Sequence, residues 1–350
     1  QEDDDSFMII SLDALLDRVK LWKRELPQIE PFYAVKCNSD EAILRALAAF
    51  GVRFDCASRA EIDMLMRMGV APDRIIYANT CKTRGYIAHA DAAGVNMMTF
   101  DNEEELEKIA QYHKHPRLIL RITASDPTAT HPLSTLKFGA DPVKSAPRLL
   151  KRTAQLGISV IGVSFHVGSG CNDPSAYRAA LEHTRDLFEL GRALGHNMQI
   201  VDVGGGFPGG KHHIPFEQFA ALIRSAIVEC FPDSSRVRFI AEPGRFFAAR
   251  PCTLVATVVA RTAVTAEKIT QNAADADAVG HMYYINDGVY GSFNCKQNDH
   301  VHPIGRPLHD KEGPLFPSII LGPTCDSGDK IEANKMMRAL AVGECMVYEV

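Results

Sequence analysis

The chain has 350 residues, of which 46% are hydrophobic and 23% are charged, and its formal net charge is −5. This length supports a large core and predicts two domains. An acidic balance without a block of Lys and Arg argues against nucleic acid as a partner. The chain has no apolar run of membrane-spanning length, and its acidic start, Glu2–Asp5, lacks the basic region of a signal peptide. We therefore expect a cytoplasmic protein.

Nine cysteines are present, an odd number with no Cys-x-x-Cys pair. This pattern indicates reduced thiols rather than a disulfide framework or a structural zinc site. Three closely spaced histidine pairs are candidate metal ligands, but they lack a cysteine or carboxylate partner at ligand spacing. We expect no metal site at these pairs, which are His113/His115, His212/His213 and His300/His302.

Short β-rich runs alternate with helical patterns in the first 250 residues. Strands are predicted at about 31–36, 52–55, 74–78, 96–100, 117–122, 159–165, 198–203 and 237–242. The apolar spacing between them predicts amphipathic helices at 40–49, 58–68, 82–93, 102–112, 145–156, 174–194 and 216–230. Parallel strands need such crossover helices, and eight of them close most naturally into a (β/α)8 barrel. An open, doubly wound sheet is the alternative.

The pattern changes near residue 250. Val- and Thr-rich runs such as Cys252–Arg261 and Met282–Ile285 are separated by Gly and Pro turns, with little helical period. They predict a separate β domain. The chain is thus an α/β protein with a barrel at 13–250 and a β domain at 251–350, and residues 1–12 are a candidate extra strand of the β domain.

Several polar residues end predicted barrel strands, where barrel enzymes place their chemistry. These are Lys36, Asp55, His166 and Glu242. Burial lowers the pKa of a lysine, which would make Lys36 nucleophilic enough to hold an aldehyde as a Schiff base. The alternatives are structural: Lys36 keeps its amine in water, His166 is a core histidine and Asp55 caps a helix.

A glycine-rich segment follows the seventh predicted strand. Gly204, Gly206 and Gly209 match the spacing of a dinucleotide-binding fingerprint, but Pro208 interrupts the turn, and the next strand's acidic residue, Glu242, comes too late. Consecutive amides of Gly204, Gly205 and Gly206 instead suit a phosphate. Arg245 would supply a permanent charge and Ser169 a hydroxyl donor. Ser58 and Glu61 form a capping box for the following helix.

An amine, a phosphate cradle and a carboxylate together indicate pyridoxal 5'-phosphate. The aldehyde needs the amine of Lys36, the phosphate needs glycine amides and Arg245, and the ring nitrogen needs a carboxylate that keeps it protonated. Glu242 is the candidate for this carboxylate, and His166 could stack on the ring face.

Six motifs identify a family that the chain resembles: YAVKCN at 33–38, HVGSG at 166–170, GGGFPG at 204–209, AEPGR at 241–245, NDGVYGSFN at 286–294 and GPTCD at 322–326. In this order they resemble the eukaryotic-type ornithine decarboxylases, which belong to the pyridoxal phosphate-dependent, alanine-racemase-like barrel proteins. The resemblance covers nearly the whole chain. It implies a barrel followed by an antiparallel, Greek-key-like β domain, and a homodimer with shared active sites. It also assigns Lys36, Asp55, His166, Ser169, Gly204, Gly205, Gly206, Glu242 and Arg245 to the cofactor.

The resemblance implies decarboxylation of L-ornithine to putrescine and carbon dioxide, a step of polyamine biosynthesis. Cys325 would donate the proton to the product carbon, and Cys325 and Asp326 would reach the active site across the dimer interface. Asp287 and Asp326 suit the distal ammonium group of the substrate, because carboxylates give charge-assisted hydrogen bonds.

Two departures and two alternatives accompany this resemblance. The family usually has an Arg before Leu-Ser, where this chain has Pro132 before Leu133 and Ser134, and it continues beyond Val350 into further strands and a Tyr near the phosphate. An antizyme-inhibitor-like binding protein, or a decarboxylase of lysine, arginine or diaminopimelate, would share much of the pattern. For antizyme itself, a thin basic surface is expected from Lys82, Thr83, Arg84 and Lys114.

Overall fold

The computed structural model describes residues 5–124, 126–132, 137–210, 214–298, 301–309 and 311–349. The chain divides into two compact units, one formed by Leu12–Ala249 and the other by the described parts of Gln1–Ser11 and Arg250–Val350. Leu133 and Ser134, beside which the family Arg is missing, lie outside the described residues, as do His212, His213 and His300.

The first unit is a closed, parallel, eight-stranded barrel, as the sequence predicts. Parallel pairing runs around the ring, for example with Tyr33 opposite Phe54 and Val163 opposite Val201, and it closes where Ile29 pairs with Phe239. The open-sheet alternative is therefore excluded. The strands are β2 (Ile29–Ala34), β3 (Arg53–Cys56), β4 (Ile75–Tyr77), β5 (Met97–Phe100), β6 (Arg117–Arg121), β7 (Val160–Ser164), β8 (Ile200–Asp202) and β9 (Arg238–Ala241).

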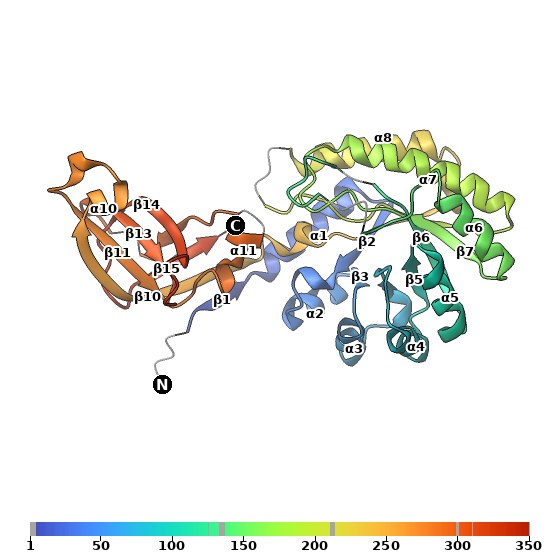
Figure 1. Ribbon diagram of the computed structural model, residues 1–350, viewed down its shortest axis with the longest axis horizontal. Coiled ribbons are helices and arrows are strands. Elements are labelled where there is room, and N and C mark those ends of the chain that lie inside the picture. The colour runs from blue at the N-terminus through green and yellow to red at the C-terminus, as the bar shows by residue number, and fades with distance from the viewer. Residues whose placement is uncertain are drawn as a thin grey trace. The chain divides into compact units, whose positions relative to one another are not determined.

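Seven crossover helices lie around the outside of these strands, close to their predicted positions (Figure 1). Asp40 and Ser58 cap the first two with side-chain oxygens. The Glu61 carboxylate accepts a hydrogen bond from the Ala57 amide, which completes the predicted capping box. The helices are α2 (Glu41–Ala49), α3 (Arg59–Arg67), α4 (Arg84–Ala93), α5 (Glu103–Tyr112), α6 (Ala146–Gln155), α7 (Ser175–Ala193) and α8 (Phe216–Cys230).

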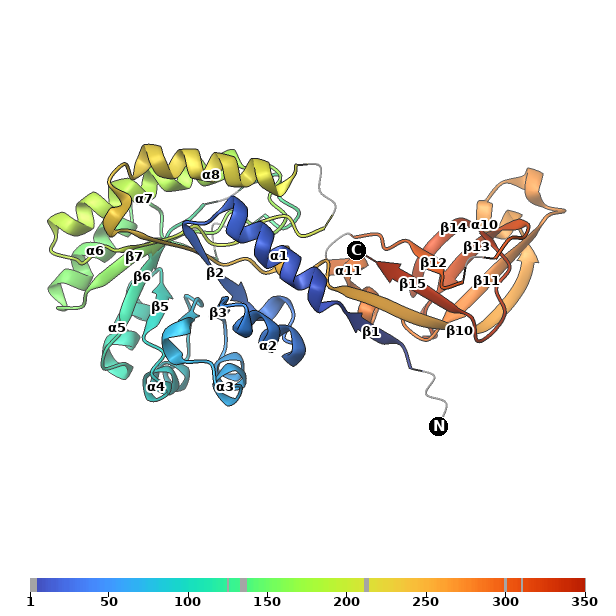
Figure 2. The ribbon, with the colours of Figure 1, turned by 180° about the vertical axis from the view of Figure 1, so that it is seen from behind.

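One long helix was not predicted from the sequence. Helix α1 (Leu12–Glu25) precedes the first barrel strand and is labelled in Figure 2. It packs against α2, α8 and the short helix α9 (Arg245–Ala248). It buries Leu15, Val19 and Trp22, which lie on one helical face. Single-turn 3-10 helices occupy Val35–Cys37, Pro72–Arg74 and Ser234–Arg236.

The barrel interior is filled by apolar side chains from most of its strands. This packing makes the barrel a solid scaffold, so polar side chains are excluded from its middle and gather at its ends. The inner cluster contains Phe32, Ile76, Ala78, Met97, Ile119, Ile161, Ile200 and Ile240.

The second unit is a mostly antiparallel sheet with the strand order β12-β15-β10-β11-β13-β14, in which β1 also pairs with β10. Strands β11 and β13 pair in parallel, which departs from the strictly antiparallel expectation. The strands are β1 (Phe7–Ile10), β10 (Cys252–Thr265), β11 (Val279–Ile285), β12 (Gly305–Pro307), β13 (Leu315–Leu321), β14 (Lys330–Arg338) and β15 (Cys345–Glu349). Short helices α10 (Glu267–Thr270) and α11 (Cys295–Asn298) and 3-10 turns at Ala273–Asp275 and Ser292–Asn294 complete it.

Within the described ranges, no helix has both the length and the apolar character needed to cross a bilayer. Among the same residues, no group of three or more His, Cys, Asp or Glu side chains is arranged to hold a metal ion.

Candidate active site

The carboxyl ends of the barrel strands carry the predicted site residues. Lys36 was predicted to end the first strand, but β2 ends at Ala34 and Lys36 lies in the 3-10 turn Val35–Cys37 that follows it. Asp55 lies in β3. His166, the Gly204–Gly206 run and Glu242 follow β7, β8 and β9. In a closed parallel barrel all these strand ends meet at one mouth, so side chains far apart in sequence share one site.

Lys36 and Asp55 form an ion pair at this mouth. Nζ of Lys36 donates a hydrogen bond to Oδ2 of Asp55 over 2.7 Å, and the Lys36 side chain is 52% exposed whereas that of Asp55 is 0% exposed. Desolvation lowers the pKa of Lys36, but the negative charges of Asp55 and then Glu242 outweigh it and raise this pKa above its usual value. The expectation that burial lowers the pKa of Lys36 is therefore wrong for this arrangement.

Glu242 lies in a buried carboxylate cluster that also contains Asp202, which the sequence analysis missed. Glu242 is 8% exposed and Asp202 is 0% exposed. Burial, followed by repulsion from Asp202 and Asp55, raises the pKa of Glu242 well above its usual range. Burial also raises the pKa of Asp202 to about 7. A polar residue ending the apolar run Ile200-Val201-Asp202 was the available signal.

His166 is held as a neutral imidazole. Its Nδ1 accepts a hydrogen bond from the Gly168 amide over 2.9 Å, which leaves the ring proton on Nε2. Burial, followed by the positive charges of Arg121 and Lys36, lowers the pKa of His166 to about 3. Arg121 ends β6 and is a second charged residue that the sequence analysis did not single out.

The three consecutive glycines approach their neighbours too closely for any side chain. A Cβ on Gly204 would lie 2.0 Å from the carbonyl oxygen of Phe165, and a Cβ on Gly205 would lie 2.7 Å from Nε2 of His166. Gly206 also has a φ of +112°, which L side chains rarely adopt. Close packing therefore requires glycine at these positions, and the Gly204 amide already donates a hydrogen bond to Oδ1 of Asp202 over 2.9 Å.

Ser169 and Arg245 lie together beside this turn. Nε and Nη2 of Arg245 donate to Oγ of Ser169 over 3.3 and 3.2 Å. A fixed cation, a hydroxyl and glycine amides provide the donors that a phosphate dianion requires.

The remaining predicted residues belong to the β unit. Oδ1 of Asp287 accepts from the amides of Gly288 and Ser292 over 2.8 and 2.9 Å, and its Oδ2 accepts from Oγ of Ser6 over 3.0 Å. These contacts hold the turn after β11.

Asp326 and Cys325 are exposed on the loop between β13 and β14. Asp326 accepts hydrogen bonds from the Tyr290 hydroxyl and the Gly328 amide, and the Tyr290 contact is the main cause of its lowered pKa.

Comparison with known proteins gives the family. The profile described as "Pyridoxal-dependent decarboxylase, pyridoxal binding domain" matches residues 12–249, the whole barrel unit. The chain belongs to the pyridoxal-dependent decarboxylases. Among their curated members, an ornithine decarboxylase of Caenorhabditis elegans is 59% identical over 99% of this chain and 82% of its own length.

Two further relatives of this decarboxylase differ in activity. Antizyme inhibitor 2 of Xenopus laevis is 44% identical over 99% of the chain and 76% of its own length. The crystal structure of the arginine decarboxylase of Paramecium bursaria Chlorella virus superposes with a TM-score of 0.90 at 34% identity, over 99% of this chain and 90% of that one. Barrel and β unit thus share their fold with a solved decarboxylase.

The site residues of this decarboxylase fit pyridoxal phosphate. Oδ1 of Asp55 is buried without a hydrogen-bond partner among the described residues, and the glycine turn has no room for a Cβ. The buried carboxylates Glu242 and Asp202 repel each other, so a protonated ring nitrogen would relieve their repulsion. Amine, anion site and carboxylate therefore match the three polar ends of the cofactor.

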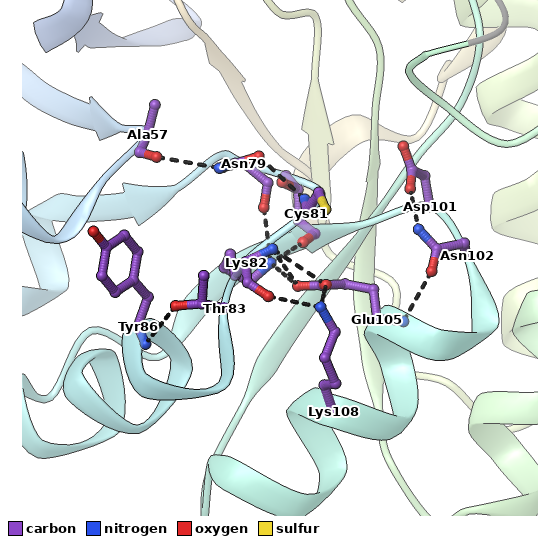
Figure 3. Close-up of polar contacts among 11 residues, drawn as sticks. Ala57, Asn79, Cys81, Lys82, Thr83, Tyr86, Asp101, Asn102, Glu105 and Lys108 are labelled. Carbon is purple, nitrogen blue, oxygen red and sulfur yellow. Dashed lines mark hydrogen bonds and ion pairs between the residues drawn. The ribbon is translucent and has the colours of Figure 1, made fainter.

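The decarboxylase also contains a buried ion-pair cluster formed by Lys82, Glu105 and Lys108 (Figure 3). The Lys82 side chain is 0% exposed, and its Nζ lies 2.8 Å from Oε1 of Glu105 and donates to the carbonyls of Asn79 and Thr99. Lys108 lies 2.6 Å from the other oxygen of Glu105. Burial lowers the pKa of Lys82. Lys82 therefore contributes nothing to the basic surface that was expected from Lys82, Thr83 and Arg84.

Proposed function

We propose that this chain is an ornithine decarboxylase, which converts L-ornithine to putrescine and carbon dioxide with pyridoxal phosphate. The observation that carries the proposal is the Lys36–Asp55 ion pair, which lies near the Glu242 carboxylate at the same end of the barrel as the glycine turn. The chain that carries this site belongs to the pyridoxal-dependent decarboxylase family. The 59% identity to a curated ornithine decarboxylase supports the choice of substrate.

Each residue of the barrel site has a role in holding the cofactor. Lys36 would supply the amine for the aldehyde, and Asp55 orients that amine through its 2.7 Å hydrogen bond. Glu242 would face the ring nitrogen, with Asp202 beside it in the buried cluster. The neutral imidazole of His166 could lie against a ring whose nitrogen is protonated without the charge repulsion that an imidazolium would bring. Ser169 and Arg245, with the amides of Gly204, Gly205 and Gly206, would bind the phosphate.

The reaction removes the carboxylate of the substrate as carbon dioxide. When bound, pyridoxal phosphate supplies an electron sink for the electron pair left on the carbon. Glu242 would favour the uptake of this electron pair by stabilising positive charge at the ring nitrogen. Cys325 then donates a proton to the carbon, and Lys36 releases the product. Asp287 and Asp326 would bind the distal ammonium of ornithine through charge-assisted hydrogen bonds.

We further propose a homodimer in which Cys325 and Asp326 of one copy complete the site of the other. The exposure of both residues supports this assignment, because each is accessible to a second chain. A cytoplasmic location is supported by the cysteine pattern of the sequence, because an odd number of nine without a Cys-x-x-Cys pair indicates reduced thiols.

The decisive experiment measures carbon dioxide and putrescine release from L-ornithine, with and without added pyridoxal phosphate. Lysine and arginine serve as competing substrates, and Lys36→Ala is the control. Cofactor-dependent release from ornithine that disappears in Lys36→Ala supports the proposal. Preferred turnover of lysine or arginine would reject ornithine as the substrate.

The variant Asp287→Glu should shift the substrate preference away from ornithine if Asp287 contacts the ammonium group. Unchanged relative rates for ornithine, lysine and arginine would show that Asp287 does not contact the substrate.

The second candidate is an antizyme-inhibitor-like binding protein, which the 44% identity to antizyme inhibitor 2 favours. In this case the chain would release no carbon dioxide and would bind antizyme. The retained Lys36, Glu242, Ser169 and Arg245 argue for the enzyme. Binding of antizyme to an active decarboxylase would indicate regulation rather than loss of catalysis.

A further inference from the structure

Helix α1 carries a buried arginine that the proposed chemistry does not use. Arg18 is 8% exposed, and its Nε donates to the carbonyl of Phe246 over 2.9 Å while Nη2 donates to the carbonyl of Pro208 over 3.1 Å. The guanidinium carbon also lies 3.7 Å from the centre of the Phe246 ring. An always-charged group in such a place is costly unless its contacts compensate.

The two carbonyls belong to the two segments assigned to the cofactor phosphate. Pro208 lies in the glycine-rich segment 204–209, and Phe246 directly follows Arg245 in α9. The segments touch, since a Cβ on Gly209 would lie 2.2 Å from the carbonyl oxygen of Arg245. Arg18 therefore links the glycine turn to the helix that carries the phosphate-binding arginine.

This link matters because α9 has only four residues and cannot hold its own position through helical hydrogen bonds. The orientation of Arg245 toward Ser169 depends on where α9 sits. Trp22, one turn after Arg18 on α1, packs edge-on against Phe207 and Phe246 with ring centres 4.9 and 5.2 Å apart. Helix α1 thus contacts both segments through two side chains.

We propose that Arg18 is a positioning residue that fixes the spacing between the glycine turn and Arg245, and thereby sets the affinity for the phosphate group of pyridoxal phosphate. The inference rests on the cofactor site proposed above. It predicts that loss of the Arg18 contacts weakens binding of the phosphate group, while the aldehyde and the ring of the cofactor keep their own contacts.

The test compares pyridoxal phosphate with pyridoxal, which lacks the phosphate. Dissociation constants of both are measured by absorbance titration of the dialysed chain, for the wild type, Arg18→Lys and Arg18→Met. We expect Arg18→Met to raise the dissociation constant of pyridoxal phosphate by about tenfold or more, which is equivalent to the loss of one charge-assisted hydrogen bond. The dissociation constant of pyridoxal should rise by less than about threefold. Arg18→Lys keeps the charge and one donor, so it should restore part of the affinity.

The matched control is Arg238→Lys. Arg238 also makes paired hydrogen bonds, to Glu30 over 2.6 and 2.7 Å, but it begins β9 at the opposite end of the barrel from the proposed site. Its replacement should leave the ratio of the two dissociation constants unchanged. If Arg18→Met does not fold, Arg18→Lys alone carries the comparison.

The outcomes separate the inference from the function on which it rests. If the Arg18 variants weaken the binding of pyridoxal and of pyridoxal phosphate equally, or weaken neither, then Arg18 contributes only general stability and the inference is overturned. A wild type that binds neither compound would overturn the proposed cofactor site and this inference with it. A ratio that changes in the Arg18 variants and not in Arg238→Lys supports it.

Discussion

Nζ of Lys36 lies 2.7 Å from Oδ2 of Asp55, a carboxylate that is completely buried. This pair sets the protonation of the amine, because the raised pKa of Lys36 reflects Asp55 first among its charged neighbours. Asp55 thus holds the amine in place and also keeps it protonated. Reaction with an aldehyde requires the neutral amine, so this carboxylate controls the pH at which Lys36 reacts.

Asp55→Asn should lower the pKa of Lys36 by removing its closest negative charge. An opposite charge at this range is worth about 1–3 pKa units, so the rate of pyridoxal phosphate attachment should shift to lower pH by about one unit or more. Stopped-flow absorbance across a pH series measures this shift. Asp63→Asn, which removes a partner of Arg59 on α3, should leave the profile unchanged. Identical profiles for Asp55→Asn and wild type would contradict the prediction.

Asp202→Asn should change how the stability of the cofactor-free chain depends on pH. The pKa of Asp202 is raised from 3.8 to about 7, so its favourable contribution is present below pH 3.8 and is lost as the pH rises through 7. The variant should therefore gain stability relative to the wild type between pH 5 and pH 8. His166, with a pKa lowered to about 3, acts in the opposite sense but equally in both proteins.

Thermal unfolding of the two proteins across this pH range measures the difference. We expect a gain of several degrees in Tm for Asp202→Asn at pH 8, since about 1 kcal/mol corresponds to roughly 2–4 °C in a domain of this size. A wild type and variant with parallel pH curves would show that Asp202 does not titrate in this range.

Lys82→Met should destabilise the barrel unit strongly. It would leave Glu105, which is 1% exposed, with Lys108 as its remaining cationic partner. Breaking a buried ion pair costs about 3–5 kcal/mol, or about 10 °C in Tm. Lys108→Met is the matched control and should cost less, because the Lys108 side chain is 27% exposed. The double variant Lys82→Met/Glu105→Leu should recover part of the loss, and no recovery in thermal unfolding would argue against the pair as its cause.

Strand positions could be predicted from the sequence because each barrel strand is a short apolar run between two amphipathic helices. Lys36, Asp55, His166 and Glu242 could be placed at one end of the barrel for the same reason: strand ends are visible in the sequence and parallel topology brings them together. The cofactor followed from the chemistry of these groups and from the family motifs.

The errors arose where long-range contacts decide. The pKa of Lys36 depends on Asp55 and Glu242, which lie 19 and 206 positions away, and burial alone gives the wrong sign. Lys82 was predicted to be a surface lysine, but its amine is buried 2.8 Å from Oε1 of Glu105. The substrate-binding role of Asp287 stays a prediction, and the structure adds that its oxygens accept hydrogen bonds from Ser6, Gly288 and Ser292. The residues around one member of such a pair do not indicate which distant residue will contact it in the folded chain.

Shared active sites can be tested by mixing two inactive variants. Lys36→Ala lacks the amine in the barrel unit, and Cys325→Ala lacks the proposed proton donor in the β unit. If Cys325 serves the site of the other copy, a dimer with one variant of each kind has one intact site and one site with both defects. Random exchange makes half the dimers mixed, so activity should return to about a quarter of the wild-type value.

Carbon dioxide release from ornithine, measured before and after mixing the purified variants, gives the result. Each variant alone should be nearly inactive, although Cys325→Ala should bind pyridoxal phosphate as the wild type does. A mixture of Lys36→Ala with Glu242→Ala is the control, because both residues lie in the barrel unit and no mixed dimer then contains an intact site. Recovery in this control, or no recovery in the first mixture although the subunits exchange, would show that Cys325 does not act across a dimer interface.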